Sequence, residues 1–437
     1  MTYQTKPLDC FDLAKDLRAR HYRDVMNSGD EGRLLIAGGN SFPWELAAGL
    51  GEFETLQGEP WGGAIAAQPE LALACAEATD ARGYGRDVCA YVRVFWGSMF
   101  LDRGPWGGFP RPAMAVALNH THCGAQGKWF QTVAEHMGVS YFCVDYPRML
   151  PSGALLPENK VLQYVPYLVA QYERFIEWAE SVTGREYDDD KLVSALLHKR
   201  RTQVLWGQVC ELQQHVPAPL HLRTMLNLMM PKLLWGFRRE AEDFYVQLLD
   251  EVKERVAHGV AALADERARF WFDFVPSYIS LGALKHLDEF GAVMVGSLYT
   301  SSFGGGCMDD GTWGIVAPFE ELGHAPQNRE EALHDIAYWD LKRDSRLNMY
   351  PLEYKIRCTF DFVRHWKCDG VILQLNRGEK GGCCGALETK LALRDAGIPC
   401  LVCEGSAADP RDMDPVQVKN SIESFMESLG LKQGDLS

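Results

Sequence analysis

An alternation of short apolar runs and longer helical patterns constrains this chain more than any other feature. Runs such as PAMAVALNHT and DGVILQLN are apolar enough for buried strands, and each is followed by a loop and a helix-like segment. Strand, loop, helix and strand in this order predict a parallel sheet with crossover helices. Between two such blocks lies a stretch with apolar residues three and four apart, which predicts an all-helical region.

These patterns divide the chain into four parts. Residues 1–55 are expected to be a helical and extended N-terminal segment, 56–154 a first α/β domain, 155–265 a helical region and 266–437 a second α/β domain. A length of 437 residues suits two or three domains. The predicted fold class is therefore α/β, with two parallel-sheet (Rossmann- or flavodoxin-like) domains separated by helices. Ligands of such sheets bind at the carboxyl ends of the strands.

Charge and hydropathy narrow the classes of partner. The net charge of -15 argues against nucleic acid, because phosphate binding needs a basic face. No stretch of about 18 uncharged apolar residues is present, so no membrane span is predicted. The polar N-terminus lacks the apolar core of a secretory signal. We expect a cytoplasmic protein that binds neither nucleic acid nor membranes.

The cysteines are the main candidates for chemistry. There are 13, and in a reducing compartment they predict buried thiols, metal ligands or reactive groups rather than disulfides. Cys123 follows an apolar strand and precedes a helix, whose positive N-terminus would lower a thiol pKa. The alternative for Cys123 is an ordinary loop cysteine.

Cys383 and Cys384 occupy the corresponding place in the second domain, in the glycine-rich loop NRGEKGGCCG. Two similar domains with cysteines at similar strand ends can bring them face to face across a cleft. Adjacent cysteines rarely both bind one metal, so one ligand and one bystander are expected. Cys89 alone favours the core, and Cys307, in SSFGGGCMDD, is a reserve candidate.

Two further groups could take part in catalysis. His120 and His122 lie beside Cys123, and either could supply a proton to a substrate, although loop hydrogen bonding is the simpler interpretation. Asn119 and Asn376 each end an apolar strand and could bind a substrate carbonyl. The chain has no Walker motif, no pair of zinc knuckles and no closely spaced ferredoxin-type run of cysteines. Thiolates spread over two domains suit a cluster held at their interface.

Three segments in order carry a family resemblance: DVCAYVRVFWG, LNHTHCGAQGKWFQ and CDGVILQLNRGEKGGCCGALETKLALRDAGIPCLVCEGSAADPRDMD. They resemble the large subunits of 2-hydroxyacyl-CoA dehydratases and of ATP-dependent (class I) benzoyl-CoA reductase, most of all the B-type subunit of the reductase. The resemblance spans roughly residues 80 to 430, with its strongest part at the C-terminal end.

The resemblance implies a fold, a cofactor and partners. Two homologous subunits each hold a 4Fe-4S cluster through three cysteines, and these match Cys89, Cys123 and the loop of Cys383 and Cys384, with Cys384 taken as the metal ligand. His122 is taken as the catalytic residue. The substrate is an acyl-CoA of the benzoyl-CoA type. An ATP-hydrolysing activator, fed by a low-potential ferredoxin, supplies the electrons that reduce the ring to a dienoyl-CoA.

The sequence departs from the family pattern at two positions. The third cysteine of the family stands nearer Glu379 than Cys383, and Tyr299 stands where several dehydratases have cysteine. Three alternatives to the reductase therefore stay open: a 2-hydroxyacyl-CoA dehydratase subunit, a non-catalytic partner with an incomplete cluster, and a two-domain sugar- or nucleotide-binding protein. The paired loop cysteines argue against the last.

Overall fold

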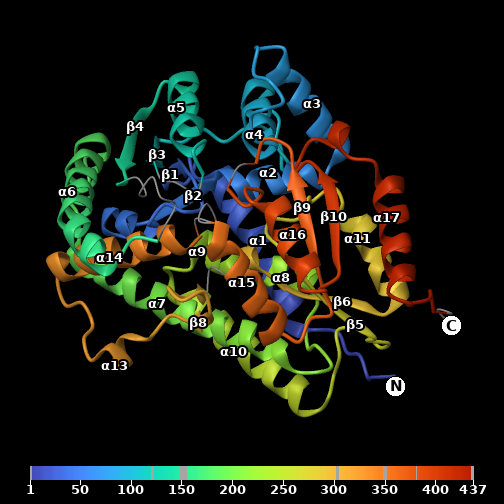
Figure 1. The fold of residues 1–437 in the computed structure, drawn as a ribbon. Coiled ribbons are helices and arrows are strands. Elements are labelled where there is room, and N and C mark those ends of the chain that lie inside the picture. The colour runs from blue at the N-terminus through green and yellow to red at the C-terminus, as the bar shows by residue number, and fades with distance from the viewer. Residues whose placement is uncertain are drawn as a thin grey trace.

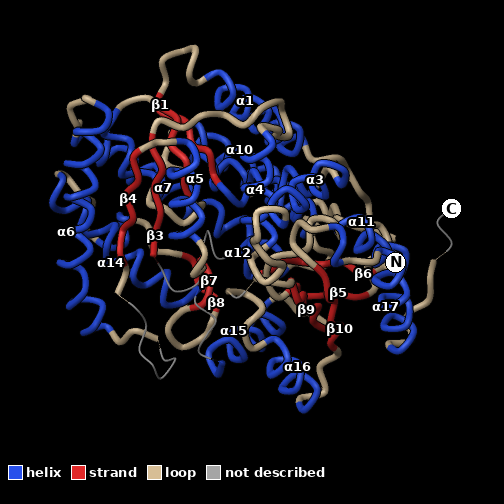
Figure 2. The backbone as a smooth tube through the Cα atoms, turned by 90° about the horizontal axis from the view of Figure 1, so that it is seen from above, coloured by secondary structure: helices blue, strands red, loops and turns tan. Residues whose placement is uncertain are grey.

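Two four-stranded parallel sheets form the frame of the molecule, as the sequence predicts. A computed structural model describes residues 2–119, 123–147, 155–301, 305–347, 352–379 and 381–434, with the backbone alone described for 305–307 and 343–347. The sheets lie beside each other, and long helices run below them (Figure 1). Seen from above, their strands form two separate groups with helix α4 between them (Figure 2).

The first sheet has the strand order β2-β1-β3-β4. Its strands are β1 (Leu34–Gly38), β2 (Phe53–Gln57), β3 (Met114–Asn119) and β4 (Ser140–Asp145). Every residue of β1 and β2 is buried, because helices cover a parallel sheet on both faces. The helices of this half are α1 (Asp9–Asn27), α2 (Gly58–Ala66), α3 (Pro69–Asp80), α4 (Ala90–Leu101) and α5 (Gln126–Met137).

The second sheet has the order β10-β9-β5-β6 and is also parallel. Its strands are β5 (Ala268–Phe272), β6 (Ala292–Ser297), β9 (Gly370–Asn376) and β10 (Cys400–Gly405). A short antiparallel pair, β7 (Gly305–Cys307) and β8 (Trp313–Ile315), follows β6. The helices of this half are α11 (Leu281–Leu284), α12 (Leu298–Ser301), α13 (Phe319–Leu322), α14 (Arg329–Leu347), α15 (Leu352–His365), α16 (Ala386–Asp395) and α17 (Pro415–Ser428).

The middle of the chain is helical, in agreement with its apolar spacing. It forms α6 (Glu158–Thr183), α7 (Asp189–Glu211), α8 (Leu222–Leu228), α9 (Met230–Trp235) and α10 (Arg239–Ala257). The start of α7 is fixed by Asp188, whose side chain accepts a hydrogen bond from the Lys191 N–H at 3.1 Å. Among the described residues, no helix combines the length and apolar character needed to cross a bilayer.

Two local details differ from expectation. The segment LGALKHLDEFG, expected to be one helix, is a single turn, α11, followed by a 3-10 helix over Lys285–Phe290. Residues 34–57, expected to belong largely to an N-terminal segment, supply two strands of the first sheet. The domain boundaries at 55/56, 154/155 and 265/266 stay predictions.

A buried ion cluster joins the two halves. The Arg93 side chain, 1% exposed, donates to Asp409 at 2.8 Å and also pairs with Asp80. Arg411 pairs with both carboxylates, at 2.7 Å to Asp409 and 2.9 Å to Asp80. Arg93 and Asp80 belong to the first half, whereas Asp409 follows β10 in the second. The cluster therefore fixes α4 against the end of the second sheet.

Asp409→Asn should destabilise the chain by about 3–5 kcal/mol, because it removes the buried carboxylate that pairs with both Arg93 and Arg411. Burial would raise the pKa of Asp409, but hydrogen bonds from Arg411 and Arg93 hold that pKa at about 2. A depressed carboxyl pKa stabilises the fold above the unfolded value of about 4 and loses that contribution as the pH falls toward the folded value. Chemical denaturation at pH 7 and pH 3 measures both effects.

The matched control is Asp395→Asn, since Asp395 forms an exposed pair with Arg394. This control should change the unfolding free energy by less than about 1 kcal/mol. Equal effects of the two substitutions would contradict the role given to the buried cluster.

Candidate functional site

Cys89 is the N-cap residue of α4. The helix begins at Ala90, and the backbone N–H groups of Tyr91 and Val92 in its first turn lie near the Cys89 sulfur without forming a cap hydrogen bond to it. Burial raises the pKa of the Cys89 thiol to about 12, and the charge of Glu379 adds to this rise. The N–H groups act in the opposite direction, as expected at a helix N-terminus. Taken alone, Cys89 was expected in the core, whereas the family resemblance made it a metal ligand, and that role stays a prediction.

Cys123 lies at the start of α5, beyond the carboxyl end of β3, as predicted. The Ala125 N–H donates to its sulfur, and burial raises the pKa of its thiol well above the ordinary value. The charges of Glu59 and Cys89 contribute to the same rise. The two thiols are thus close enough to interact, although they come from different strand-to-helix connections.

The loop between β9 and α16 approaches the Cys89 segment from the second half. Gly378 has a φ of +73°, and a Cβ atom there would lie 2.7 Å from the Val88 carbonyl oxygen. The next residue, Glu379, accepts hydrogen bonds from the N–H groups of Gly382 and Cys383 at 3.0–3.1 Å. Glycine is required at 378 both by the left-handed backbone and by the close approach.

Lys355 binds the same loop through its backbone carbonyl groups. Its ammonium group donates to the carbonyls of Gly382, at 2.6 Å, and Cys384, at 3.0 Å, and pairs with Asp273 at 3.0 Å. Asp273 follows β5 directly. The carboxyl ends of β5 and β9 and the cysteine loop are therefore joined through one buried lysine.

Cys383 and Cys384 differ in their surroundings. The Cys383 sulfur donates to the Gln374 carbonyl at 3.3 Å and accepts from the Asn376 N–H at 3.2 Å, so it faces the end of β9. Burial raises the pKa of its thiol. Cys384 is half-buried, and the structure gives its side chain no role, so its place as the metal ligand stays a prediction.

The predicted histidines and asparagines, and the reserve cysteine, add little to the description of the site. His120 and His122 lie outside the described residues, as does the side chain of Cys307. The side-chain amides of the two asparagines bond within the protein: Asn119 donates to Asp145 at 2.9 Å and Asn376 to the Val275 carbonyl at 3.0 Å. Within the described ranges, no three His, Cys, Asp or Glu side chains are placed to hold a single metal ion.

Glu59, which the sequence patterns did not single out, lies beside the two thiols. It belongs to the first turn of α2, and its carboxylate accepts from the Gln126 side chain at 3.0 Å and from the Asn40 N–H at 3.1 Å. Glu59 follows strand β2 almost directly. Recognition of FETLQ as a strand would have placed this carboxylate at the same sheet edge as Cys123.

An aromatic pocket of about 400 Å³ opens on the other side of Glu59. We call it the aromatic pocket, and its lining includes Arg18, Tyr22, Glu59, Trp106, Tyr278 and Tyr299. Trp106 stacks on Tyr22 with ring centroids 3.7 Å apart. Tyr278 and Tyr299 are hydrogen-bonded to each other, and burial raises the pKa of Tyr278 to about 12, so it stays protonated near neutral pH.

Tyr91 connects this pocket to the cysteines. Its ring packs against Tyr278 with centroids 6.1 Å apart, and its backbone lies in the first turn of α4, two residues after Cys89. A group bound in the aromatic pocket would therefore lie close to the thiols and to one carboxylate.

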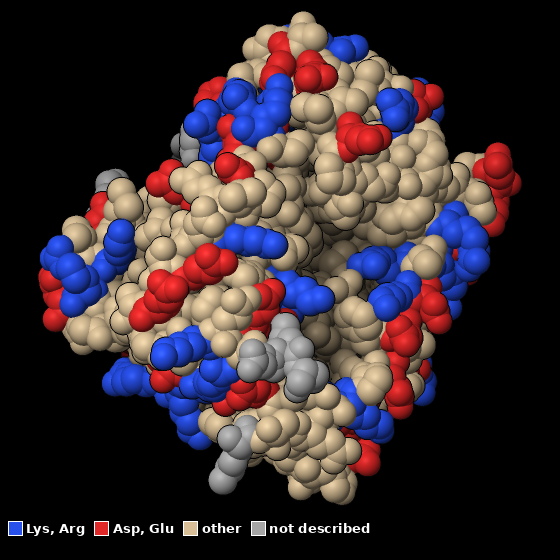
Figure 3. Space-filling view, turned by 90° about the vertical axis from the view of Figure 1, so that its right-hand side faces the viewer, with Lys and Arg blue, Asp and Glu red and all other residues tan. Residues whose placement is uncertain are grey.

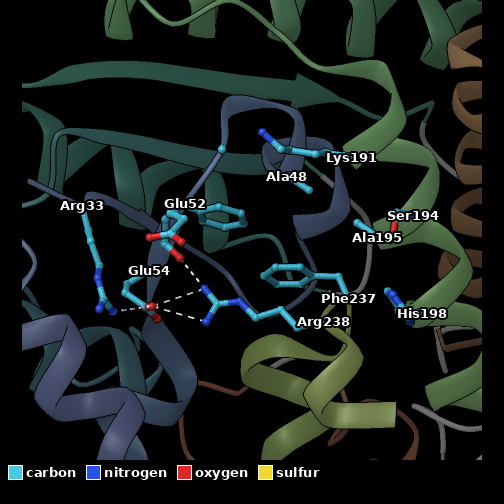
Figure 4. A pocket seen from close by; sticks show the side chains of 12 residues that line it. Arg33, Ala48, Glu52, Glu54, Lys191, Ser194, Ala195, His198, Phe237 and Arg238 are labelled. Carbon is cyan, nitrogen blue, oxygen red and sulfur yellow. Dashed lines mark hydrogen bonds and ion pairs between the residues drawn. The ribbon is translucent and has the colours of Figure 1, made fainter. Parts of the chain in front are cut away.

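A second pocket of about 580 Å³ lies at the opposite edge of the first sheet (Figure 4). Arg33 and Phe53 stand at the amino ends of β1 and β2, whereas ligands of parallel sheets bind at the carboxyl ends. Its charged groups already pair with each other, with Arg238 3.3 Å and Arg33 3.7 Å from Glu54. This pocket is therefore a weaker candidate for the substrate-binding site than the aromatic pocket.

Comparison with known proteins decides the family. The model of the 2-hydroxyglutaryl-CoA dehydratase D-component family matches residues 42–429. The chain belongs to this family. It is 23% identical over 433 residues to the (R)-phenyllactyl-CoA dehydratase alpha subunit of Clostridium sporogenes, covering 96% of this chain and 97% of that protein.

Two further relatives show the range of the family. The (R)-2-hydroxyisocaproyl-CoA dehydratase alpha subunit of Clostridioides difficile is 23% identical over 424 residues, which is 95% of either chain. The B-type subunit of benzoyl-CoA reductase from Thauera aromatica is 24% identical over 374 residues, 81% of this chain and 79% of that protein. The resemblance stated from the sequence is confirmed.

Gly378→Ala should lower the unfolding free energy by about 1–3 kcal/mol through backbone strain, with a further cost from the clash with the Val88 carbonyl. Gly397→Ala is the matched control, because Gly397 has a φ of +71° and no atom within 4 Å of its Cβ position. Chemical denaturation of both variants separates strain from close contact. Equal losses would contradict the packing of this loop against residues 87 and 88.

Proposed function

We propose that this chain is the iron–sulfur subunit of an ATP-dependent benzoyl-CoA reductase-type complex. The observation that carries the proposal is the aromatic pocket, which opens beside two thiols at helix N-termini. A planar aromatic acyl group suits walls made of Trp106, Tyr22 and Tyr278. The reductase relative supports an aromatic CoA thioester as the substrate class.

The donors present fit a 4Fe-4S cluster. Cys89 and Cys123 offer soft thiol ligands, which iron–sulfur clusters prefer, and the loop of residues 379–384 offers a third donor from the second half. When bound, the cluster would supply electrons of low potential. The partners we propose are a homologous cluster-bearing subunit, an ATP-hydrolysing activator and a low-potential ferredoxin.

The residues of the chain itself would orient the substrate and handle protons. Arg18, at the pocket edge, carries a positive charge suited to the phosphates of CoA. The protonated Tyr278 and Tyr299 hydroxyls can donate hydrogen bonds to a thioester oxygen in the pocket. Glu59 lies between pocket and thiols, where a carboxyl group can give or take a proton during ring reduction. The buried side chains of Tyr22 and Tyr299 exclude water from their part of the wall.

A second candidate is a 2-hydroxyacyl-CoA dehydratase subunit. Two dehydratase relatives favour it, since the phenyllactyl-CoA and 2-hydroxyisocaproyl-CoA enzymes match 95–96% of the chain against 81% for the reductase relative. Assays with the activator distinguish the two candidates. Formation of a dienoyl-CoA from benzoyl-CoA would support the reductase. Dehydration of (R)-phenyllactyl-CoA without reduction of benzoyl-CoA would replace it with the dehydratase.

Cys123→Ala and Cys89→Ala should each lose most of the iron and acid-labile sulfide, because each removes a thiolate ligand. The protein is purified anaerobically after co-expression with its partner subunits, and about four of each element per wild-type chain is expected. Cys400→Ala, in β10, is the control and should keep the full content. Full iron in Cys123→Ala would contradict the site, and a wild-type chain without iron would indicate a non-catalytic partner.

Trp106→Ala should weaken benzoyl-CoA binding about fivefold, since it removes an aromatic wall worth about 1 kcal/mol. Titration calorimetry of the assembled complex measures the dissociation constant. Trp178→Ala is the control, because Trp178 packs against Phe142 and Phe175 away from the pocket. An unchanged dissociation constant in Trp106→Ala would remove the aromatic pocket as the acyl site.

A further inference from the structure

The loop between β9 and α16 offers three side chains that can bind a metal: Glu379, Cys383 and Cys384. The Cys383 sulfur already bonds at the end of β9, where the Gln374 carbonyl and the Asn376 N–H lie 3.3 Å and 3.2 Å away. Binding iron through Cys383 would remove its thiol proton and so end its hydrogen bond to the Gln374 carbonyl. Its thiol has the role of a small structural group that closes the loop.

Glu379 comes from the second half, yet it lies next to the segment that leads into Cys89. The backbone agrees with this placement, because Gly378 packs against the carbonyls of Asp87 and Val88, directly before Cys89.

Asp412 fixes the two approaching segments relative to each other. Its carboxylate, 7% exposed, pairs with Arg86 at 2.9 Å and with Arg377 at 3.5 Å. Arg86 lies three residues before Cys89, and Arg377 lies two residues before Glu379. The segments that carry Cys89 and Glu379 are thus tied to the same buried anion.

The Glu379 carboxylate is also held in place. The Gly382 N–H donates to both of its oxygens, and the Cys383 N–H donates to one of them. Hydrogen bonds of this kind orient ligating carboxylates in metal sites. An ionised carboxylate has about four lone-pair positions, so at least one remains for a metal.

We infer that Glu379 is the third protein ligand of the cluster, beside Cys89 and Cys123. This inference rests on the proposed function, because it requires that a cluster binds here. A carboxylate oxygen is a harder ligand than a thiolate, so the iron it binds exchanges more readily than the other two ligated irons. The site then combines two soft ligands from the first half with one hard ligand from the second.

The test compares isosteric variants of the full chain, purified anaerobically with its partner subunits. Glu379→Gln keeps the size and the acceptor oxygen but removes the anionic ligand, and we expect loss of at least one iron in four. Glu379→Cys should restore the iron and change the electron paramagnetic resonance spectrum of the reduced cluster. Glu388→Gln, on the exposed side of α16, is the control and should match the wild type.

Cys384→Ser decides between the two loop donors and should keep its iron. Unchanged iron and an unchanged spectrum in Glu379→Gln would overturn the inference, as would iron loss in Cys384→Ser alone. Failure of Glu379→Cys to restore iron would also overturn it. These outcomes leave the proposed function intact, whereas a wild-type chain without iron would remove the cluster and this inference together.

Discussion

The buried pair between Arg93 and Asp409 sets the geometry on which the rest of the site depends. Arg93 lies one helical turn after Cys89, and Asp409 lies just beyond the second sheet. A buried guanidinium needs its carboxylate partner, since an unpaired charge in the protein interior is strongly unfavourable. The ion pair between Arg93 and Asp409 therefore holds the first turn of α4, and Cys89 at its start, against the second half.

The N-termini of two helices provide a positive electrostatic environment for the thiols of Cys89 and Cys123. Cys89 is the N-cap residue of α4 and Cys123 precedes α5, so both sulfurs lie near the positive end of a helix. Burial and nearby carboxylates nevertheless raise the pKa of both thiols, which keeps them protonated in the chain alone. A bound cation reverses this balance, because metal binding displaces the thiol protons and the positive charge of the cation compensates the carboxylates.

On the face seen in Figure 3, Lys and Arg are interspersed with Asp and Glu around a central hollow.

The sequence predicts the parts of this arrangement that depend on local pattern. The apolar run of β3 followed by a loop and a helix places Cys123, and the same pattern after β9 places the loop of Cys383. Cys89, taken alone, was expected in the core because it begins an apolar segment, and only the family resemblance made it a ligand. Glu59 was missed because β2 was not recognised. The pairing of Arg93 with Asp409 spans 316 positions, and no periodicity encodes a contact at that separation.

The ion cluster around Asp409 has a consequence for how a substrate reaches the thiols. Many two-domain proteins admit their ligands by hinge opening, which requires an interface that separates at low cost. Here ion pairs cross the interface, among them the buried pair of Arg93 with Asp409, and separation of the halves would break them. These ion pairs oppose a hinge movement between the two halves. Under the proposed function, the acyl group would then enter through the mouth of the aromatic pocket, whose lining includes Arg18, and the width of that mouth would filter its shape.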